Sequence, residues 1–469
     1  MTPNEIQHSS TTAGLPISPA LGPTLENTGV LRHPAVLDQR TLYIAFLSII
    51  VAGITTVIAR GLVALIGLIT NLSFYGRVSF ELTSPANNHL GYLVILIPII
   101  GGLIVGMMAR YGSKAIRGHG IPEAMEQILT NESRIPLRMT FLKPLSAAIV
   151  IGTGGPFGAE GPIIATGGAL GSYIGQIIHV SAQERKTILA AGAAAGMTAI
   201  FGTPLSAILL AIELLVFEFR PRSFIPVSVA TLAAICLRPL LFGDAPLFHV
   251  PAFPAAGHGE LLVYTLIGAL AGIGAVVLSK SIYFIEDMFE KLPMHWMWWP
   301  AIGGCVVGVI GYYAPLTLGI GYQNIEQMLN GNFVGITLLV FCILKFLSWS
   351  IALGSGTSGG TLAPLFTLGG GLGVLSAQVV SKIIPGLAVD LRMAALVGMA
   401  SCFAGASRAM FASIAFALEI TQQYNALLPL LAGCTAAFIV SALLMKNTIM
   451  TEKLSRRGHH VPSEYTARH

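Results

Sequence analysis

Apolar residues dominate the chain from about residue 41 to residue 445, and Gly and Pro interrupt the apolar stretches more often than charged residues do. Several stretches exceed the roughly 20 residues that a helix needs to cross a bilayer. Gly and Pro within such stretches favour short, tilted and re-entrant helices. The pattern therefore predicts an all-α polytopic membrane protein. The expected spans are 41–70, 89–110, 140–178, 187–217, 224–242, 260–284, 298–314, 335–354, 361–384, 392–423 and 426–445.

The two ends of the chain differ from this apolar centre. Residues 1–40 are polar and rich in Thr, Ser, Pro and Asn, so we expect a disordered cytoplasmic tail and no signal peptide. The membrane domain is expected at 41–457, with a short cytoplasmic tail at 458–469 and no regulatory domain after it. Basic residues gather at 110–117, 185–186, 220–222 and 453–457, which the positive-inside tendency assigns to the cytoplasm.

The chain repeats itself. The segment "KPLSAAIVIGTGGPFGAEGPIIATGGALG" from Lys143 aligns without a gap with "KFLSWSIALGSGTSGGTLAPLFTLGGGLG" from Lys345. A second match pairs "GAAAGMTAIFGTPLSAILLAIEL" with "GMASCFAGASRAMFASIAFALEI", and "GHGIPEAMEQIL" resembles "GIGYQNIEQML". Three matches in one order predict duplicated halves at about 88–242 and 298–445. Duplicated membrane halves with interrupted helices are typical of transporters, whose substrate site lies where the repeats meet.

Composition supports a lipid environment. Only 10% of the residues are charged and 54% are hydrophobic, whereas soluble domains carry about 25% charged residues. The net charge of +5 is spread thinly and forms no basic tract, so nucleic acid is not an expected partner. No HExxH spacing occurs, and we expect neither a metal nor a cofactor.

Three Gly- and Pro-containing motifs each precede a helical run: "GHGIP" at 118–122, "GAEGP" at 158–162 and "GTLAP" at 360–364. A helix N-terminus presents free N–H groups and a partial positive charge. Each motif alone is also compatible with an ordinary glycine-capped turn. Several helix starts directed at one point would bind a small anion weakly enough to release it.

Glu160 stands alone in a long uncharged stretch. A carboxylate inside a membrane is costly, which makes it a functional candidate. At a helix start it could occupy the place of a transported anion and leave when protonated. The alternative is a structural carboxylate satisfied by backbone amides.

Other ionisable residues recur in both halves. Glu213 and Glu419 share one repeat position, which favours a structural role such as capping a neighbouring backbone. Lys143 and Lys345 stand at matched segment starts, and we expect them to be interfacial anchors.

Taken together, "GHGIP", "GAEGP", "GTLAP", "ASIAFALEIT" and "NTIMTEKLSRRG" resemble the CLC family of chloride channels and chloride/proton exchangers over about residues 41–457. The resemblance implies a CLC-type fold of two inverted repeats and a homodimer with one anion pathway in each subunit. It also implies Glu160 as the gate and an anion site at His119, Gly120, Ile121, Gly158, Ala159, Gly161, Thr361, Leu362 and Met450.

The chain departs from the family pattern at four of these places and at one further position, Leu214. His119 replaces the usual Ser, Ala159 a basic residue, and Leu362 a Phe. Met450 replaces the central tyrosine, and Leu214 stands where exchangers often carry an inner proton glutamate. The anion path would then consist mostly of helix ends and backbone amides.

These departures leave competing hypotheses. Leu214 and Met450 favour channel-like or weakly proton-coupled conduction of chloride. The alternative is a chloride/proton antiporter whose relay does not use the inner glutamate, with water or His119 in its place. Selectivity for nitrate, bromide or fluoride stays open. A more distant alternative is an intramembrane enzyme with Glu160 as its base, although no partner nucleophile accompanies that residue. The expected location is a bacterial inner membrane.

Overall fold

The computed structural model describes residues 38–243, 247–384, 389–459 and 461. Regular structure in these ranges is helical, apart from two isolated bridges between loops. The tail predicted for residues 1–37 lies outside the described residues. Helix α3 (Gln39–Tyr75) begins directly after Asp38, whose carboxylate accepts a hydrogen bond from the backbone N–H of Thr41 at 2.7 Å.

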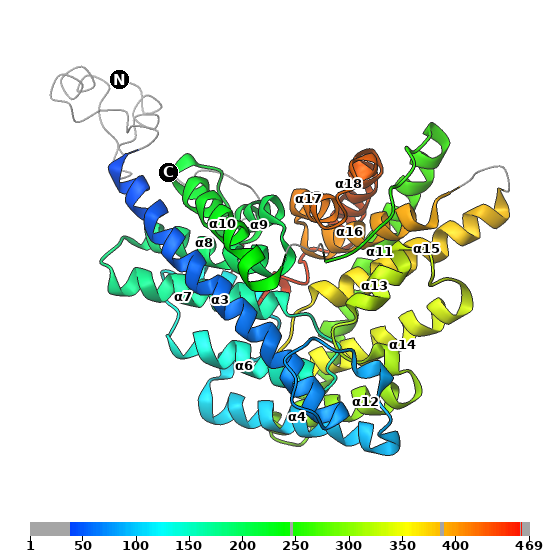
Figure 1. Ribbon diagram of the computed structural model, residues 1–469, viewed down its shortest axis with the longest axis horizontal. Coiled ribbons are helices and arrows are strands. Elements are labelled where there is room, and N and C mark those ends of the chain that lie inside the picture. Colours follow the sequence, from blue (N-terminus) through cyan, green and yellow to red (C-terminus); the bar gives the residue numbers. More distant parts are fainter. Residues whose placement is uncertain (1–37, 244–246, 385–388, 460, 462–469) are drawn as a thin grey trace, which may run out of the picture.

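The helices form two sets of matching order (Figure 1). The first set contains α4 (Leu96–Met107), α5 (Ile121–Thr130), α6 (Arg138–Gly152), α7 (Glu160–Ile177), α8 (Ala182–Phe201), α9 (Pro204–Leu210) and α10 (Pro221–Phe242). The second set contains α12 (Trp299–Tyr313), α13 (Tyr322–Leu329), α14 (Gly335–Gly354), α15 (Leu362–Ile383), α16 (Leu391–Ser407), α17 (Met410–Thr421) and α18 (Leu427–Leu444). The long helix α11 (His258–Glu290) connects the sets, and α19 (Glu452–Arg456) follows them.

Three predicted spans are each broken into more than one helix. The stretch 140–178 breaks between α6 and α7, and 392–423 breaks at Arg408, whose φ is +62°. The stretch 187–217 breaks at Gly202, in the left-handed region with a φ of +70°, just before Pro204. Short broken helices of this kind were expected from the Gly and Pro content, but their boundaries were not.

Both repeats use glycine to bring helix backbones together. In the first, a Cβ added to Gly167 of α7 would lie 2.2 Å from the carbonyl oxygen of Gly192 in α8. In the second, a Cβ on Gly369 of α15 would lie 2.6 Å from the carbonyl oxygen of Gly398 in α16. Larger side chains at these matched positions would separate the paired helices, so glycine is needed for this packing.

The two matched lysines are buried, and the prediction of interfacial anchors is wrong. Lys143 is 1% exposed and its Nζ donates to the carbonyl oxygens of Ile116 and Gly118, each at 2.8 Å. Lys345 is 0% exposed and donates to Thr317 and Gly319 in the second repeat. These carbonyls belong to the last residues of short 3-10 turns and to the loops after them, inside the protein, where an unpaired backbone group would be costly.

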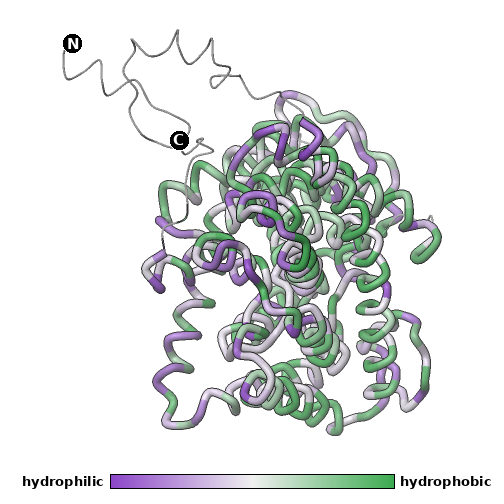
Figure 2. Tube along the Cα trace, turned by 90° about the vertical axis from the view of Figure 1, so that its left-hand side faces the viewer, coloured by the Kyte–Doolittle hydropathy of each residue, from purple (hydrophilic) through white to green (hydrophobic). Residues whose placement is uncertain are grey.

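Apolar side chains also cover the outer surface. Seven helices in the described part of the chain are long and apolar enough to span a membrane. Large hydrophobic side chains along them are exposed, among them Leu42 and Phe46 of α3 and Leu240 of α10. Figure 2 shows hydrophobic and near-neutral positions along most of the helical trace. The protein is a multi-pass integral membrane protein.

Candidate functional site

Backbone hydrogen bonds between repeats hold the three motif loops together. Gly118, before α5, donates to the carbonyl oxygen of Thr357 at 2.9 Å. Gly158, before α7, and Gly360, before α15, exchange N–H···O bonds of 3.1 and 2.9 Å. The starts of α5, α7 and α15 are therefore fixed next to one another. The sequence predicted this convergence from the three motifs together and not from any one of them.

The first turns of α5 and α7 are in direct backbone contact. A Cβ on Gly161 would lie 1.8 Å from the carbonyl oxygen of His119, and one on Gly120 would lie 2.3 Å from that of Gly161. Gly120 also has a φ of +99°, and its N–H donates to the Glu123 carboxylate at 2.7 Å. Only glycine satisfies both the close approach and the backbone angle here.

The helix starts are buried, and those of α7 and α15 are not capped by their own side chains. Ile121, Ala159, Thr361 and Leu362 are each at most 2% exposed. Ala159 and Thr361 are the residues that precede α7 and α15, and neither side chain accepts a hydrogen bond from the helix. N–H groups of the first turns are thus left without a side-chain partner from the cap, as an anion site built from backbone requires.

Glu160 is the first residue of α7 and is 1% exposed. Its Oε1 accepts a hydrogen bond from the hydroxyl of Tyr322 at 3.0 Å. Its Oε2 is buried, has no hydrogen-bond partner among the described residues, and lies where a Cβ on Gly158 would fall. The backbone N–H of Ala363 in α15 is close to the same carboxylate. The carboxylate therefore lies over the helix starts, where an anion would bind.

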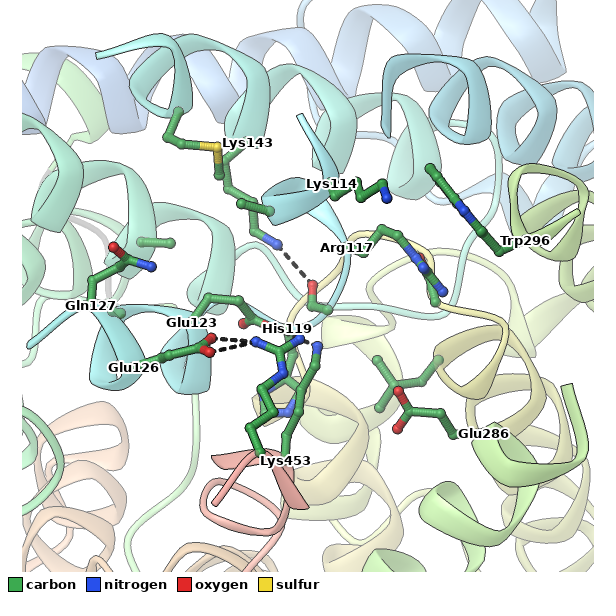
Figure 3. A pocket seen from close by; sticks show the side chains of 18 of the residues that line it. Lys114, Arg117, His119, Glu123, Glu126, Gln127, Lys143, Glu286, Trp296 and Lys453 are labelled. Atoms are coloured by element: carbon green, nitrogen blue, oxygen red, sulfur yellow. Dashed lines mark hydrogen bonds and ion pairs between the residues drawn. The ribbon is translucent and has the colours of Figure 1, made fainter. Parts of the chain in front are cut away.

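A cavity of about 520 Å³ reaches this region from the side of α19 (Figure 3). His119 lines the cavity, is 6% exposed, and its Nδ1 has no partner among the described residues. Glu123 of α5 and Lys453 of α19 form an ion pair of 2.9 Å in its wall, and Arg457 pairs with Glu126 one turn further along α5. These ion pairs attach α19 and the residue that follows it to α5, the helix that starts two residues after His119.

Met450 precedes α19 and is completely buried. Its neighbour Ile449 accepts a hydrogen bond from the Tyr283 hydroxyl at 2.7 Å, and the backbone of Ile449 interacts with the His119 side chain. The segment with Met450 is therefore placed beside the start of α5. No sequence pattern pointed to Tyr283, which comes from the long connecting helix α11.

Glu213 and Glu419 each cap a helix of the other repeat. The Glu213 carboxylate accepts from the N–H groups of Phe411 and Ala412 in α17 at 3.1 and 2.9 Å. The Glu419 carboxylate accepts from Leu205 and Ser206 in α9, both at 2.8 Å. Neither carboxylate lines the large cavity.

Leu214 follows Glu213 in a π-helical turn, η6 (Ala211–Val216), and is 4% exposed. Its apolar side chain can neither donate nor accept a proton. Since Glu213 does not line the cavity of about 520 Å³ either, this turn supplies no carboxylate to that cavity.

Sequence reasoning missed Tyr322, Lys453 and the burial of both lysines. A signal existed for Tyr322, since "GIGYQ" repeats "GHGIP" and places Tyr322 opposite Ile121 in the alignment of the halves. The contacts of Lys453 had no such signal, because its partner Glu123 is far away in the chain.

Comparison with known proteins agrees with this arrangement. The family model described as voltage gated chloride channel matches residues 100–442. An H(+)/Cl(-) exchange transporter, ClcA, of Vibrio cholerae serotype O1 is 31% identical over 355 residues, covering 72% of this chain and 74% of the relative. A putative chloride channel protein, ClcB-like, of Ralstonia nicotianae is 25% identical over 366 residues, covering 77% and 85%.

Solved structures show the same fold. A slow cyanobacterial Cl⁻/H⁺ antiporter matches with a TM-score of 0.79 and 23% identity, over 90% of this chain and 98% of that one. A CLC-type fluoride/proton antiporter matches with a TM-score of 0.69 and 19% identity, over 86% and 96%. The chain therefore belongs to the voltage-gated chloride channel (CLC) family, whose members are membrane transporters or channels and not enzymes.

Proposed function

We propose that this chain exchanges chloride for protons across the membrane, with Glu160 as the group that alternately takes a proton and occupies the anion site. The observation that carries the proposal is the Glu160 carboxylate lying over the starts of α7 and α15. A carboxylate in an anion site competes with chloride, and protonation removes the charge that holds it there. Movement of the two ions is thereby linked at one residue.

Coupled exchange replaces channel-like conduction as the favoured hypothesis. Relatives such as ClcA of Vibrio cholerae are named exchange transporters, and they cover most of this chain. Leu214 does not oppose this, because protons can follow a route other than the usual inner carboxylate. In the proposed route, His119 takes protons from the cavity of about 520 Å³, which it lines with an unpartnered Nδ1.

The anion path follows from the same geometry. Chloride would pass from this cavity along His119, Gly120 and Ile121 at the start of α5. It would then reach the site formed by Gly158, Ala159, Gly161, Thr361 and Leu362, with Met450 beside the inner constriction. Each subunit of a homodimer would contain one such path. Bromide, nitrate and fluoride are tested against chloride by competition in the same vesicles.

The deciding experiment imposes a chloride gradient on proteoliposomes at symmetric pH and records external chloride and pH together. Exchange predicts uphill proton movement at a fixed ratio to chloride, with no such movement in protein-free vesicles. Chloride efflux without proton movement would reject exchange and establish the channel-like alternative that Leu214 and Met450 favour. Absence of flux for every small anion would reject both.

A further inference from the structure

Tyr322 is the side chain that contacts the gate directly. It is the first residue of α13, and its hydroxyl donates to Glu160 Oε1 at 3.0 Å. We propose that Tyr322 is a positioning residue that holds the Glu160 carboxylate, in its charged form, in the anion site. The inference rests on the proposed role of Glu160 as the gate.

The ring of Tyr322 is fixed by aromatic neighbours. It packs edge-on against Phe201, at the end of α8, with ring centroids 6.3 Å apart, and against Phe248 at 6.2 Å. Phe201 in turn packs against Phe416 of α17 at 5.1 Å. These contacts leave the ring few orientations, so the hydroxyl is aimed at Glu160 before any proton or anion arrives.

Tyr322 contacts Glu160 and also lines a second cavity. This cavity, of about 70 Å³, is lined by Tyr322, by Thr70 near the C-terminal end of α3, and by Ser84 in the following loop. It therefore lies at the end of α3 remote from Asp38, away from the cavity lined by Lys453. A proton that arrives from this side meets Glu160 beside the tyrosine.

A donated O–H favours the charged form of the acceptor. The hydroxyl hydrogen bond stabilises the carboxylate and is lost or weakened when Glu160 binds a proton. Backbone N–H groups of Glu160 itself and of Ala363 also lie close to the carboxylate and act in the same sense. The carbonyl of His119 faces Gly161 next to it, and Phe201 and Phe416 from α8 and α17 carry no charge.

The corresponding position in the first repeat shows what the hydroxyl adds. "GHGI" aligns with "GIGY", so Ile121 at the start of α5 is the counterpart of Tyr322. Both helices start in the same way, each after a glycine with positive φ, at Gly120 and Gly321. A helix start of this kind therefore does not require a tyrosine. The hydroxyl of Tyr322 is specific to the second repeat, where it contacts Glu160.

The test is the external pH dependence of chloride flux in vesicles for Tyr322→Phe, which keeps the ring and removes the hydroxyl. The midpoint should move to higher pH by about one unit, a tenfold change in proton concentration. Flux at neutral external pH should increase. Tyr75→Phe is the matched control, because Tyr75 also donates one hydrogen bond beside the second cavity, to the Ser84 carbonyl oxygen at 2.5 Å, but not to Glu160.

The variant Glu160→Gln, alone and combined with Tyr322→Phe, distinguishes an error in the role of Tyr322 from an error in the role of Glu160. A midpoint shift that is absent in Tyr75→Phe and vanishes in the Glu160→Gln background supports the inference. An unchanged midpoint in Tyr322→Phe, with Glu160→Gln still abolishing the pH dependence, overturns the role of Tyr322 and leaves the gate standing. A pH dependence that survives in Glu160→Gln removes the gate and the inference with it. Tyr322→Leu, which also lacks the hydroxyl, gives the same readings if the Phe variant does not fold.

Discussion

Replacement of Glu213 by Gln should destabilise the protein without disturbing proton coupling. Glu213 comes directly before the position where exchangers often carry a proton carboxylate, so a role in proton transfer is the competing hypothesis. In the structure its two oxygens accept from the N–H groups of Phe411 and Ala412 at the start of α17. Glutamine keeps the shape, removes the charge, and points an NH₂ group at one of the two donors.

The magnitude follows from those two hydrogen bonds. A bond to a charged group contributes about 1.5–3 kcal/mol, and loss of a helix cap costs about 1 kcal/mol. Because Gln retains one acceptor, we expect a loss of about 2–4 kcal/mol for Glu213, which is 9% exposed. Glu419→Gln breaks the equivalent pair of bonds to Leu205 and Ser206 and should cost somewhat less, because Glu419 is partly exposed.

Thermal unfolding in detergent, followed by size-exclusion chromatography, measures the effect. For a chain of this length, about 2 °C per kcal/mol gives a decrease of about 4–8 °C in the unfolding temperature of Glu213→Gln. Glu81→Gln, in an exposed loop, is the control and should not shift it. The reasoning fails if Glu213→Gln unfolds at the control temperature and yet loses proton movement, since Glu213 would then carry protons.

Three further variants test the pathway and its support. Glu160→Gln should conduct chloride, lose most of its dependence on external pH and stop proton countertransport; unchanged pH dependence in vesicles would count against the gate. His119→Ser should remove the strengthening of anion binding by internal acidification, measured by calorimetric anion titration at two pH values, and identical behaviour of both proteins would make His119 a bystander. Lys143→Met removes the ammonium donor from the buried carbonyls of Ile116 and Gly118, of which Gly118 keeps a 3.4 Å bond from the N–H of Gly359. Each lost bond costs about 1–3 kcal/mol, so the unfolding temperature should decrease by several degrees relative to Lys280→Met on the surface.

The fold class and the location of the helix starts could be predicted from the sequence, because both depend on local patterns. Apolar length predicts membrane helices, and Gly followed by Pro predicts a helix start. The duplication added long-range information, since "GAEGP" and "GTLAP" occupy equivalent places in the two halves. Their direct backbone pairing, Gly158 with Gly360, was still not predictable, because alignment of two segments does not say that they touch.

Lys143 and Lys345 show why the remaining contacts could not be predicted from the sequence. A lysine at the edge of an apolar stretch is usually at a membrane interface, and the sequence does not reveal a buried loop that needs donors. The carbonyls that need a donor here are those of Ile116 and Gly118, which are 25 or more residues away from Lys143 in the chain. The Glu123–Lys453 ion pair joins residues 330 positions apart in the chain, and no local sequence pattern predicts it.

The repeats are alike where they support the candidate site and different at the residues that we propose act on ions. Lys143 and Lys345 donate to matched carbonyls, and Glu213 and Glu419 cap matched helices, so the scaffold is nearly symmetric. At the helix starts, however, the counterpart of Glu160 is Leu362. A symmetric pathway would treat both sides of the membrane alike and could not distinguish where a proton arrives. Because the charged residue stands on one repeat alone, with the hydroxyl of Tyr322 on the other repeat directed at it, the two directions of access to the anion site differ chemically. Exchange of unlike ions requires such a difference. The matched lysines and capping glutamates of the two repeats hold Glu160 and Tyr322 in position.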